Sequence, residues 1–222
     1  MAGRGEVPAE QQAHPRVFTI NKEGEWVPAL DPIHFDKDIA GVGAGPTFGA
    51  VMADRDENIT IGLIPCAVGA TSITTWVPGG YHKPTGIHPW NDALERTRQA
   101  MQDGTLKGIL WNQGEADTKN IELASAYQER LDSLIIRFRG EFGEDIPIIV
   151  AQLPEFFSSK RQFAEYINTA VTTLPTRFSS IACVDTKGLI CKTDSIHYNS
   201  ASYRILGQRY AEKMIELLEK DL

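Results

Sequence analysis

Residues 108 to 117 read Gly-Ile-Leu-Trp-Asn-Gln-Gly-Glu-Ala-Asp. The stretch begins as a short apolar strand and ends in a polar turn that carries the amide of Gln113 and the carboxylate of Glu115. Ligands of open α/β sheets bind at the carboxyl ends of the strands. We therefore predict that this turn contacts a substrate, and that further site residues follow other strands of the same sheet.

Hydrophobic spacing predicts the other strands and the helices. Three more short apolar runs are typical of strands buried on both faces, at Ile59 to Cys66, Ile146 to Gln152 and Ile181 to Asp185. Apolar residues recur at helical spacing from Trp90 to Met101, Tyr127 to Phe138, Phe163 to Val171 and Ser200 to Leu218. This alternation predicts an α/β fold, a three-layer α/β/α sandwich around a parallel, flavodoxin-like sheet. Two long stretches, Val7 to Gly45 and Val68 to Pro89, are expected to be irregular and functional.

Length and charge favour one medium-sized domain, residues 1–222, with a small partner. A chain of 222 residues with 42% hydrophobic content buries a core without disulfides or a metal. Its formal net charge of -7 and the absence of any basic run argue against a nucleic-acid partner. The expected partner is a small or neutral molecule, and the sequence predicts no oligomeric state.

Neither a metal, a cofactor nor a membrane segment is predicted. Cys66, Cys183 and Cys191 lack the spacing of a zinc site or a disulfide framework and are expected to be buried free thiols. No apolar stretch is long enough to cross a membrane, and the first residues carry no hydrophobic signal core. As written, the chain is expected to be soluble and cytoplasmic, whereas an upstream extension with a signal would direct it to secretion.

Candidate catalytic groups follow the predicted strands. Asp194 stands three residues before His197, where its carboxylate can bond one ring nitrogen and leave the other as a general base. The alternative is a helix-capping Asp beside a surface His. Gly69 follows another strand and can present a backbone N–H, which together with the Gln113 amide would form an oxyanion hole. The alternative for Gly69 is an ordinary glycine between a strand and a loop.

Several blocks of the sequence resemble one known family. They are Met1 to Gly5, Trp26 to Ala29, Asp31 to His34, Gly41 to Gly43, Trp111 to Asp117 and Asp194 to His197. In this order they resemble the sialate O-acetylesterase and acetylxylan esterase family, carbohydrate esterase family 6 of the SGNH hydrolases. The Trp-x-Gln-Gly-Glu-x-Asp block is the most specific of them. The resemblance extends along the whole chain and implies the SGNH hydrolase fold.

The resemblance also implies roles for single residues. His197 would be the general base, Asp194 its orienting carboxylate, and Gly69 and Gln113 the oxyanion-hole donors. Glu115 matches a family Glu that also contacts the catalytic His, so the acid of the triad stays open between Asp194 and Glu115. The alternative for Glu115 is a carboxylate at a helix N-terminus. No metal or cofactor is implied.

One departure from the family concerns the nucleophile. The family block reads Gly-Gln-Ser-Asn-Met-Ala-Gly-Arg-Gly and its Ser attacks the substrate, whereas this sequence begins at the Met of that block. The preceding apolar strand, central in the family sheet, is absent with it, and the chain as given is expected to be inactive. Neither Ser72, which follows the oxyanion Gly, nor Ser195, which lies between Asp194 and His197, is expected to replace the nucleophile.

The sequence therefore predicts a carbohydrate O-acetylesterase that acts on an acetylated carbohydrate or small acetyl ester. One alternative is a non-catalytic relative that binds acetylated sugars. Another is a flavodoxin-like scaffold subunit in which the polar residues are incidental. Aromatic residues of the long loops are candidates to stack on sugar rings, with core packing or loop anchoring as the alternative for each: Trp26, Trp76 and Tyr81. Three histidines in these loops, His34, His82 and His88, are interpreted as structural or solvent-facing.

Overall fold

A computed structural model describes residues 2–220, which fall into two compact units. The first unit comprises Met1–Gly69, Asn91–Thr105 and Leu189–Glu212, and the second comprises Ala70–Trp90, Leu106–Gly188 and Lys213–Leu222. Helices α2 (Pro89–Ala100) and α8 (Ser200–Lys220) contribute residues to both units. Each unit is described by itself below.

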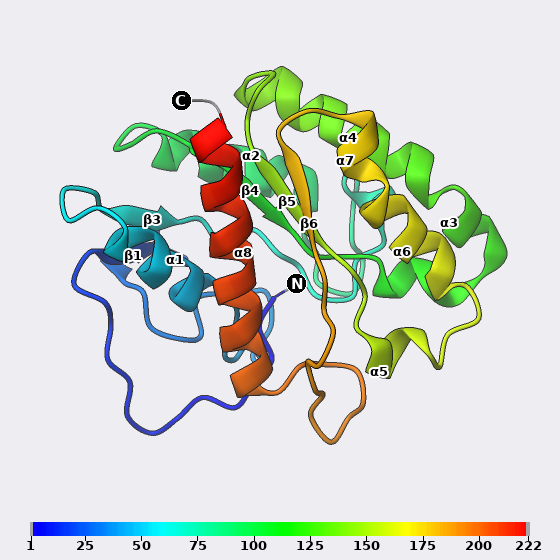
Figure 1. Ribbon diagram of the computed structural model, residues 1–222, viewed down its shortest axis with the longest axis horizontal. Helices are drawn as coiled ribbons and strands as arrows, with labels where there is room; N and C mark the ends of the chain where they lie inside the picture. The colour runs from blue at the N-terminus through cyan, green and yellow to red at the C-terminus, as the bar shows by residue number, and fades with distance from the viewer. Residues whose placement is uncertain (1, 221–222) are drawn as a thin grey trace. The chain divides into compact units, whose positions relative to one another are not determined.

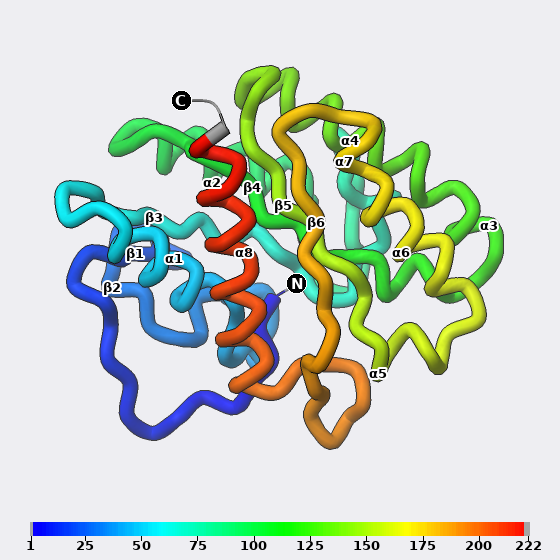
Figure 2. Tube along the Cα trace, in the orientation of Figure 1, coloured from blue at the N-terminus to red at the C-terminus, as the bar shows by residue number. Residues whose placement is uncertain are grey.

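The first unit contains a small mixed sheet covered by one helix. Its strands are β1 (Val17–Ile20), β2 (Trp26–Pro28) and β3 (Ile61–Leu63), in the order β2-β1-β3. Strand β1 pairs antiparallel with β2 and parallel with β3. Helix α1 (Gly45–Asp54) lies along these strands in Figure 2. Their core consists of buried apolar side chains, Val17, Ala29, Ile33, Ala53 and Leu63.

Glycines allow two segments of this unit to pack backbone against backbone. The N–H of Gly5 donates to the carbonyl of Val42 at 3.0 Å, and the N–H of Gly41 donates to the carbonyl of Gly3 at 2.9 Å. A Cβ atom on Gly41 would lie 2.1 Å from the Gly5 carbonyl oxygen, and one on Gly3 would lie 2.5 Å from that of Val42. Two sequence blocks that resemble the family are therefore joined by direct contact.

We expect Gly41→Ala to lower the free energy of unfolding by about 3 kcal/mol, because the added methyl group meets a backbone oxygen that has no rotamer to change. The matched control is Gly140→Ala. A Cβ atom on Gly140 meets nothing within 4 Å, and the residue lies in a helix, so this change is expected to stabilise the protein by about 0.5–1 kcal/mol. Urea unfolding of both variants measures the difference, and equal stabilities would contradict the close packing at Gly41.

The second unit contains a parallel sheet with the order β4-β5-β6. Its strands are β4 (Ile109–Trp111), β5 (Ile148–Ala151) and β6 (Ile181–Val184), and Figure 1 shows them side by side. All residues of β5 are buried, as expected for a central parallel strand. The remaining elements of this unit are η1 (Ile73–Thr75), η2 (Glu115–Lys119), α3 (Ile121–Ser125), α4 (Tyr127–Phe142), α5 (Glu155–Ser158), α6 (Ala164–Thr172) and α7 (Leu174–Arg177).

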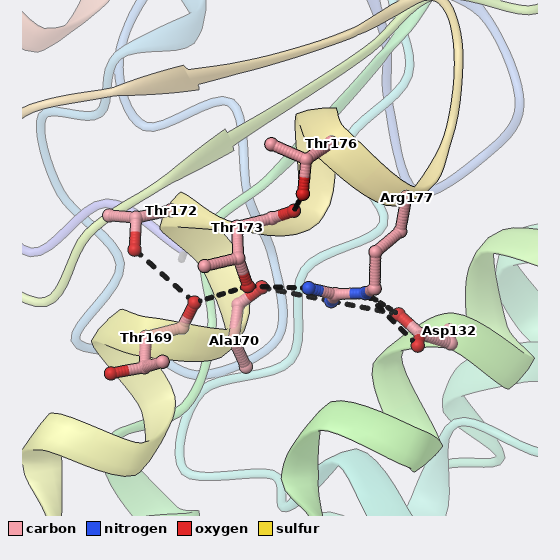
Figure 3. Close-up of polar contacts among 7 residues, drawn as sticks. All are labelled: Asp132, Thr169, Ala170, Thr172, Thr173, Thr176 and Arg177. Atoms are coloured by element: carbon pink, nitrogen blue, oxygen red, sulfur yellow. Dashed lines mark hydrogen bonds and ion pairs between the residues drawn. The ribbon is translucent and has the colours of Figure 1, made fainter.

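An ion pair connects two helices of the second unit (Figure 3). The guanidinium of Arg177 in α7 donates to the Asp132 carboxylate of α4 through Nη2 at 2.9 Å and through Nε at 3.1 Å. Its Nη2 also donates to the carbonyl of Ala170 at 3.1 Å. The fork of the guanidinium thus connects α4, α6 and α7.

Most predicted elements are present, but their pairing differs from the prediction. The four predicted strands appear as β3, β4, β5 and β6, and the four predicted helices as α2, α4, α6 and α8. The prediction of one parallel sheet containing all four strands was wrong, because β3 pairs with β1 in a sheet other than that of β4 to β6. Strands β1 and β2 lie within residues 7–45, which were expected to be irregular. The signal that marks them is Val-Phe-Thr-Ile followed by a turn in which Gly24 has a φ of 83°.

The prediction of buried free thiols was correct in part. The three cysteines are free, but they are half-buried rather than fully buried. Desolvation still raises the pKa of the Cys183 thiol to about 11. Among the described helices, none is both long and apolar enough to span a membrane.

Candidate functional site

The loop between β6 and α8 carries the predicted Asp-His pair in the first unit. Asp194 Oδ2 lies 2.8 Å from His197 Nδ1. The other carboxylate oxygen of Asp194 accepts the backbone N–H groups of Ile196 at 2.8 Å and of His197 at 2.9 Å. When Nδ1 carries the ring proton, Nε2 is the nitrogen that accepts one. The geometry is that of a histidine oriented as a general base.

The alternative of a helix-capping Asp194 is not what the structure shows. Helix α8 begins at Ser200, and the side chain that caps it is Asn199, which accepts the N–H of Ser202 at 2.8 Å. Desolvation alone would raise the pKa of Asp194, but the hydrogen bonds from the backbone and ring of His197 lower it to about 2. The carboxylate is therefore ionised beside the imidazole. Its stabilising contribution is present above the ordinary pKa of 3.8 and is lost as the pH falls toward about 2.

The N-terminal block lies beside this loop within the first unit. Lys192 Nζ donates to the carbonyl of Arg4 at 2.8 Å, and Ser200 Oγ donates to the carbonyl of Glu6 at 2.7 Å. A Cβ atom on Gly5 would lie 2.8 Å from Ser200 Oγ. The segment that resembles the end of the nucleophile block is thus held against both sides of the loop that carries Asp194 and His197.

Gly69 contacts the same N-terminal block through a buried ion pair. Arg4 Nη2 lies 2.6 Å from Asp36 Oδ2, and the two side chains are 5% and 3% exposed. Asp36 Oδ2 also accepts the N–H of Gly69 at 2.8 Å, and Lys37 Nζ donates to the Gly69 carbonyl at 2.9 Å. A Cβ atom on Gly69 would lie 2.6 Å from Arg4 Nη2, so a larger residue here would displace the guanidinium from its present position. The N–H predicted to face an oxyanion is bonded to Asp36 in this structure.

The contacts around Asp36 determine the charge of its carboxylate. Desolvation would raise the pKa of Asp36, but the hydrogen bonds from Arg4 and from the Gly69 N–H hold it below its ordinary value. Nearby, burial lowers the pKa of His34 to about 3, so its ring is neutral. The cluster formed by Arg4, Asp36, Lys37 and Gly69 was not predicted from the sequence.

Gln113 lies in the second unit, just after β4, in a saturated hydrogen-bond network. Its Nε2 donates to the carbonyl of Thr71 at 2.8 Å and to Asp117 Oδ2 at 2.6 Å. Tyr127 Oη donates to the Gln113 backbone carbonyl at 2.8 Å and also lies 3.1 Å from its Oε1. Both amide hydrogens of Gln113 therefore already have acceptors, and the side chain is held in one orientation.

Asp117 is the centre of this network and was given no role in the sequence prediction. Its carboxylate is fully buried. It also accepts hydrogen bonds from the Ser72 hydroxyl at 2.5 Å and from the backbone N–H of Ile73 at 3.0 Å. Desolvation raises its pKa, and the hydrogen bonds from Ser72, Gln113 and Ile73 oppose that rise. Asp117 thus fastens the segment from Thr71 to Ile73 to the turn after β4. Its position at the end of the Trp-x-Gln-Gly-Glu-x-Asp block was the available signal.

Glu115 begins η2 and is half-buried in the second unit. Its place in the first turn fits the alternative of a carboxylate at a helix N-terminus. The predicted site residues are thus distributed over both units, with His197, Asp194 and Gly69 in the first and Gln113 and Glu115 in the second. Within residues 2–220, no group of three His, Cys, Asp or Glu side chains has the arrangement of a metal site.

Known proteins share both sequence and fold with the chain. The family described as carbohydrate esterase, sialic acid-specific acetylesterase, matches residues 1–216. A probable carbohydrate esterase from Arabidopsis thaliana is 30% identical over 234 residues, which cover 96% of this chain and 85% of that protein. A solved structure of an Arabidopsis thaliana protein has a TM-score of 0.86 at 28% identity. The match covers 97% of this chain and 93% of that protein's chain.

Two more distant structures share the α/β fold. The crystal structure of NanS has a TM-score of 0.75 at 16% identity, with 99% of this chain and 94% of that chain covered. A carbohydrate acetylesterase from Xanthomonas citri has a TM-score of 0.66 at 17% identity, with 89% of this chain and 47% of that chain covered. At these identities the likeness concerns the fold alone.

Proposed function

Because the chain belongs to the sialic acid-specific acetylesterase family of carbohydrate esterases, we propose that it hydrolyses acetyl esters on sugars by a serine-type acyl-enzyme mechanism. The single observation that carries this proposal is the arrangement in the first unit. There Asp194 and His197 contact each other, and Lys192 and Ser200, which flank the pair, donate to the carbonyls of Arg4 and Glu6 in the segment that follows the nucleophilic serine in the family. The substrate class, acetylated carbohydrate, follows from the family and from the names of the relatives.

The proposed chemistry proceeds through an acetyl-enzyme. His197 Nε2 takes the proton of the serine hydroxyl as the serine oxygen attacks the acetyl carbonyl carbon, and Asp194 stabilises the resulting imidazolium. The imidazolium then gives its proton to the sugar oxygen as the ester C–O bond breaks. Water, deprotonated by the same imidazole, attacks the acetyl-enzyme and releases acetate and the free serine. The mechanism requires the family block Gly-Gln-Ser-Asn in front of Met1, together with the central strand of the SGNH fold.

Gly69 and Gln113 remain the proposed donors to the oxyanion. In this structure the Gly69 N–H bonds to Asp36, and the Gln113 amide bonds to Thr71 and Asp117. To stabilise the tetrahedral intermediate, each donor would exchange an internal acceptor for the substrate oxygen. Within each unit, these hydrogen bonds hold the donor in one orientation before the substrate arrives.

The test is to read the in-frame sequence upstream of the Met1 codon and to assay the encoded protein on 4-nitrophenyl acetate and acetylated xylan. An upstream Gly-Gln-Ser-Asn block together with acetate release from either compound is the expected result. A chain that starts at Met1 serves as the control and is expected to release no acetate. Absence of hydrolysis by the longer protein, or hydrolysis that survives Ser→Ala in that block, would overturn the proposal.

A further inference from the structure

A rigid hairpin in the second unit displays two aromatic rings. The His82 N–H donates to the carbonyl of Ile87 at 2.8 Å, and His88 Nδ1 lies 3.0 Å from the carbonyl of Gly80. These bonds close the hairpin and bring the rings of Tyr81 and His88 to a centroid distance of 5.0 Å at an interplanar angle of 42°. Both residues are exposed, Tyr81 to 52%. The hairpin therefore presents two neighbouring, solvent-exposed rings.

The other aromatic residues that the sequence suggested for sugar stacking have packing roles. Trp76 is 5% exposed and packs edge-on against Trp111 at 4.9 Å. Trp26 lies in β2, donates through Nε1 to Asp103 at 2.9 Å, and covers Gly62. For both tryptophans the alternative of packing or anchoring accounts for the side chain. Tyr81 is the member of that group whose ring is left open to solvent.

We propose that the Tyr81–His88 hairpin is a carbohydrate subsite, in which a pyranose ring of the glycan stacks on the Tyr81 face. The sugar class rests on the proposed function of the chain. The C–H groups on the flat face of a pyranose are attracted by the negative face of an aromatic ring. The Tyr81 hydroxyl and the His88 Nε2 are groups that can bond sugar hydroxyls. Because the hairpin is already ordered, binding costs little conformational entropy.

Two glycines of the hairpin, Gly79 and Gly86, lie close to Tyr81 in the sequence. A Cβ atom on Gly86 would meet only the Tyr81 hydroxyl, at 3.9 Å, and one on Gly79 would meet nothing within 4 Å. A Cβ atom at position 86 would therefore approach the Tyr81 hydroxyl, and one at position 79 would lie in open space. His82, by contrast, points into the hairpin and bonds Thr85 at 2.8 Å, so it serves the scaffold.

The protein expressed with its in-frame upstream codons offers a matched test by binding alone, because unacetylated ligands have no ester to hydrolyse. It would be applied to an array of unacetylated pentose and hexose pyranosides, and the best ligand would be titrated by isothermal calorimetry. We expect Tyr81→Ala to weaken that ligand about tenfold and His88→Ala by less. Tyr166 lies on α6 with a similar exposure of 47%, so Tyr166→Ala is the control and is expected to bind like the unchanged protein.

The outcomes separate this proposal from the proposed function. Binding to none of the pyranosides by the folded chain, checked by circular dichroism, would overturn the subsite, as would equal affinities of Tyr81→Ala and Tyr166→Ala. Hydrolysis of 4-nitrophenyl acetate by the upstream-extended protein tests the esterase separately. Tyr81→Ala is expected to raise KM for acetylated glycan, whereas the control Tyr166→Ala is expected to leave the turnover of both esters unchanged.

Discussion

Replacing His197 by Gln is expected to lower kcat for acetyl ester hydrolysis about 1,000- to 10,000-fold, because the serine then has no base to accept its proton. Asp194→Asn is expected to cost about 1,000-fold, since an amide that donates to Nδ1 favours the wrong tautomer of the ring. Both are measured on the protein expressed with the in-frame codons upstream of Met1. The 2.8 Å contact between Asp194 and His197 motivates both changes.

Glu115→Gln is the control that decides which carboxylate is the acid of the triad. If Asp194 orients His197, Glu115→Gln is expected to lose less than about tenfold in kcat. A larger loss for Glu115→Gln than for Asp194→Asn would transfer the role to Glu115. Because the pKa of Asp194 is about 2, its carboxylate stays ionised at any pH where activity is measured. Titration of Asp194 itself is therefore expected to add no pH dependence to the deficit of Asp194→Asn above its ordinary pKa of 3.8.

The elements that the sequence predicted are those whose signal is local. Strands β4, β5 and β6 are short runs of apolar residues, and their burial in a parallel sheet follows from that composition. Helices α4 and α6 bury the apolar stripes that predicted them. Asp194 and His197 were found for the same reason, because their contact spans three residues of one loop.

The parts that were missed depend on contacts between distant segments. Arg4 and Asp36 are 32 residues apart, and nothing near either residue marks it as half of a buried ion pair. Tyr127 reaches Gln113 across 14 residues, from a helix predicted only by its apolar stripe. Sheet pairing also depends on distant segments. Strand β3 pairs with β1, and the composition of Ile61–Leu63 does not determine this partner.

The buried ion pair between Arg4 and Asp36 leads to the largest expected loss of stability. Arg4→Met keeps most of the volume and apolar stem of the side chain but leaves a carboxylate that is 3% exposed without its cation. We expect the free energy of unfolding to fall by about 3–5 kcal/mol, measured by urea unfolding at neutral pH. The lowered pKa of Asp36 agrees with this expectation, because it means that the folded protein stabilises the ionised carboxylate. Its contribution is present above the ordinary value of 3.8 and is lost as the pH falls below it.

A double variant separates the charge from the packing. In Arg4→Met/Asp36→Asn the buried charge is gone, while the Asn oxygen still accepts the Gly69 N–H, so the protein is expected to be more stable than Arg4→Met alone. Lys213→Met breaks an exposed ion pair with Glu216, whose side chains are 38% and 53% exposed, and is expected to change stability by less than about 0.5 kcal/mol. Equal stabilities of Arg4→Met and the double variant would show that lost packing, and not the unpaired carboxylate, causes the loss. Recovery in the double variant would show that the unpaired carboxylate of Asp36 causes the loss.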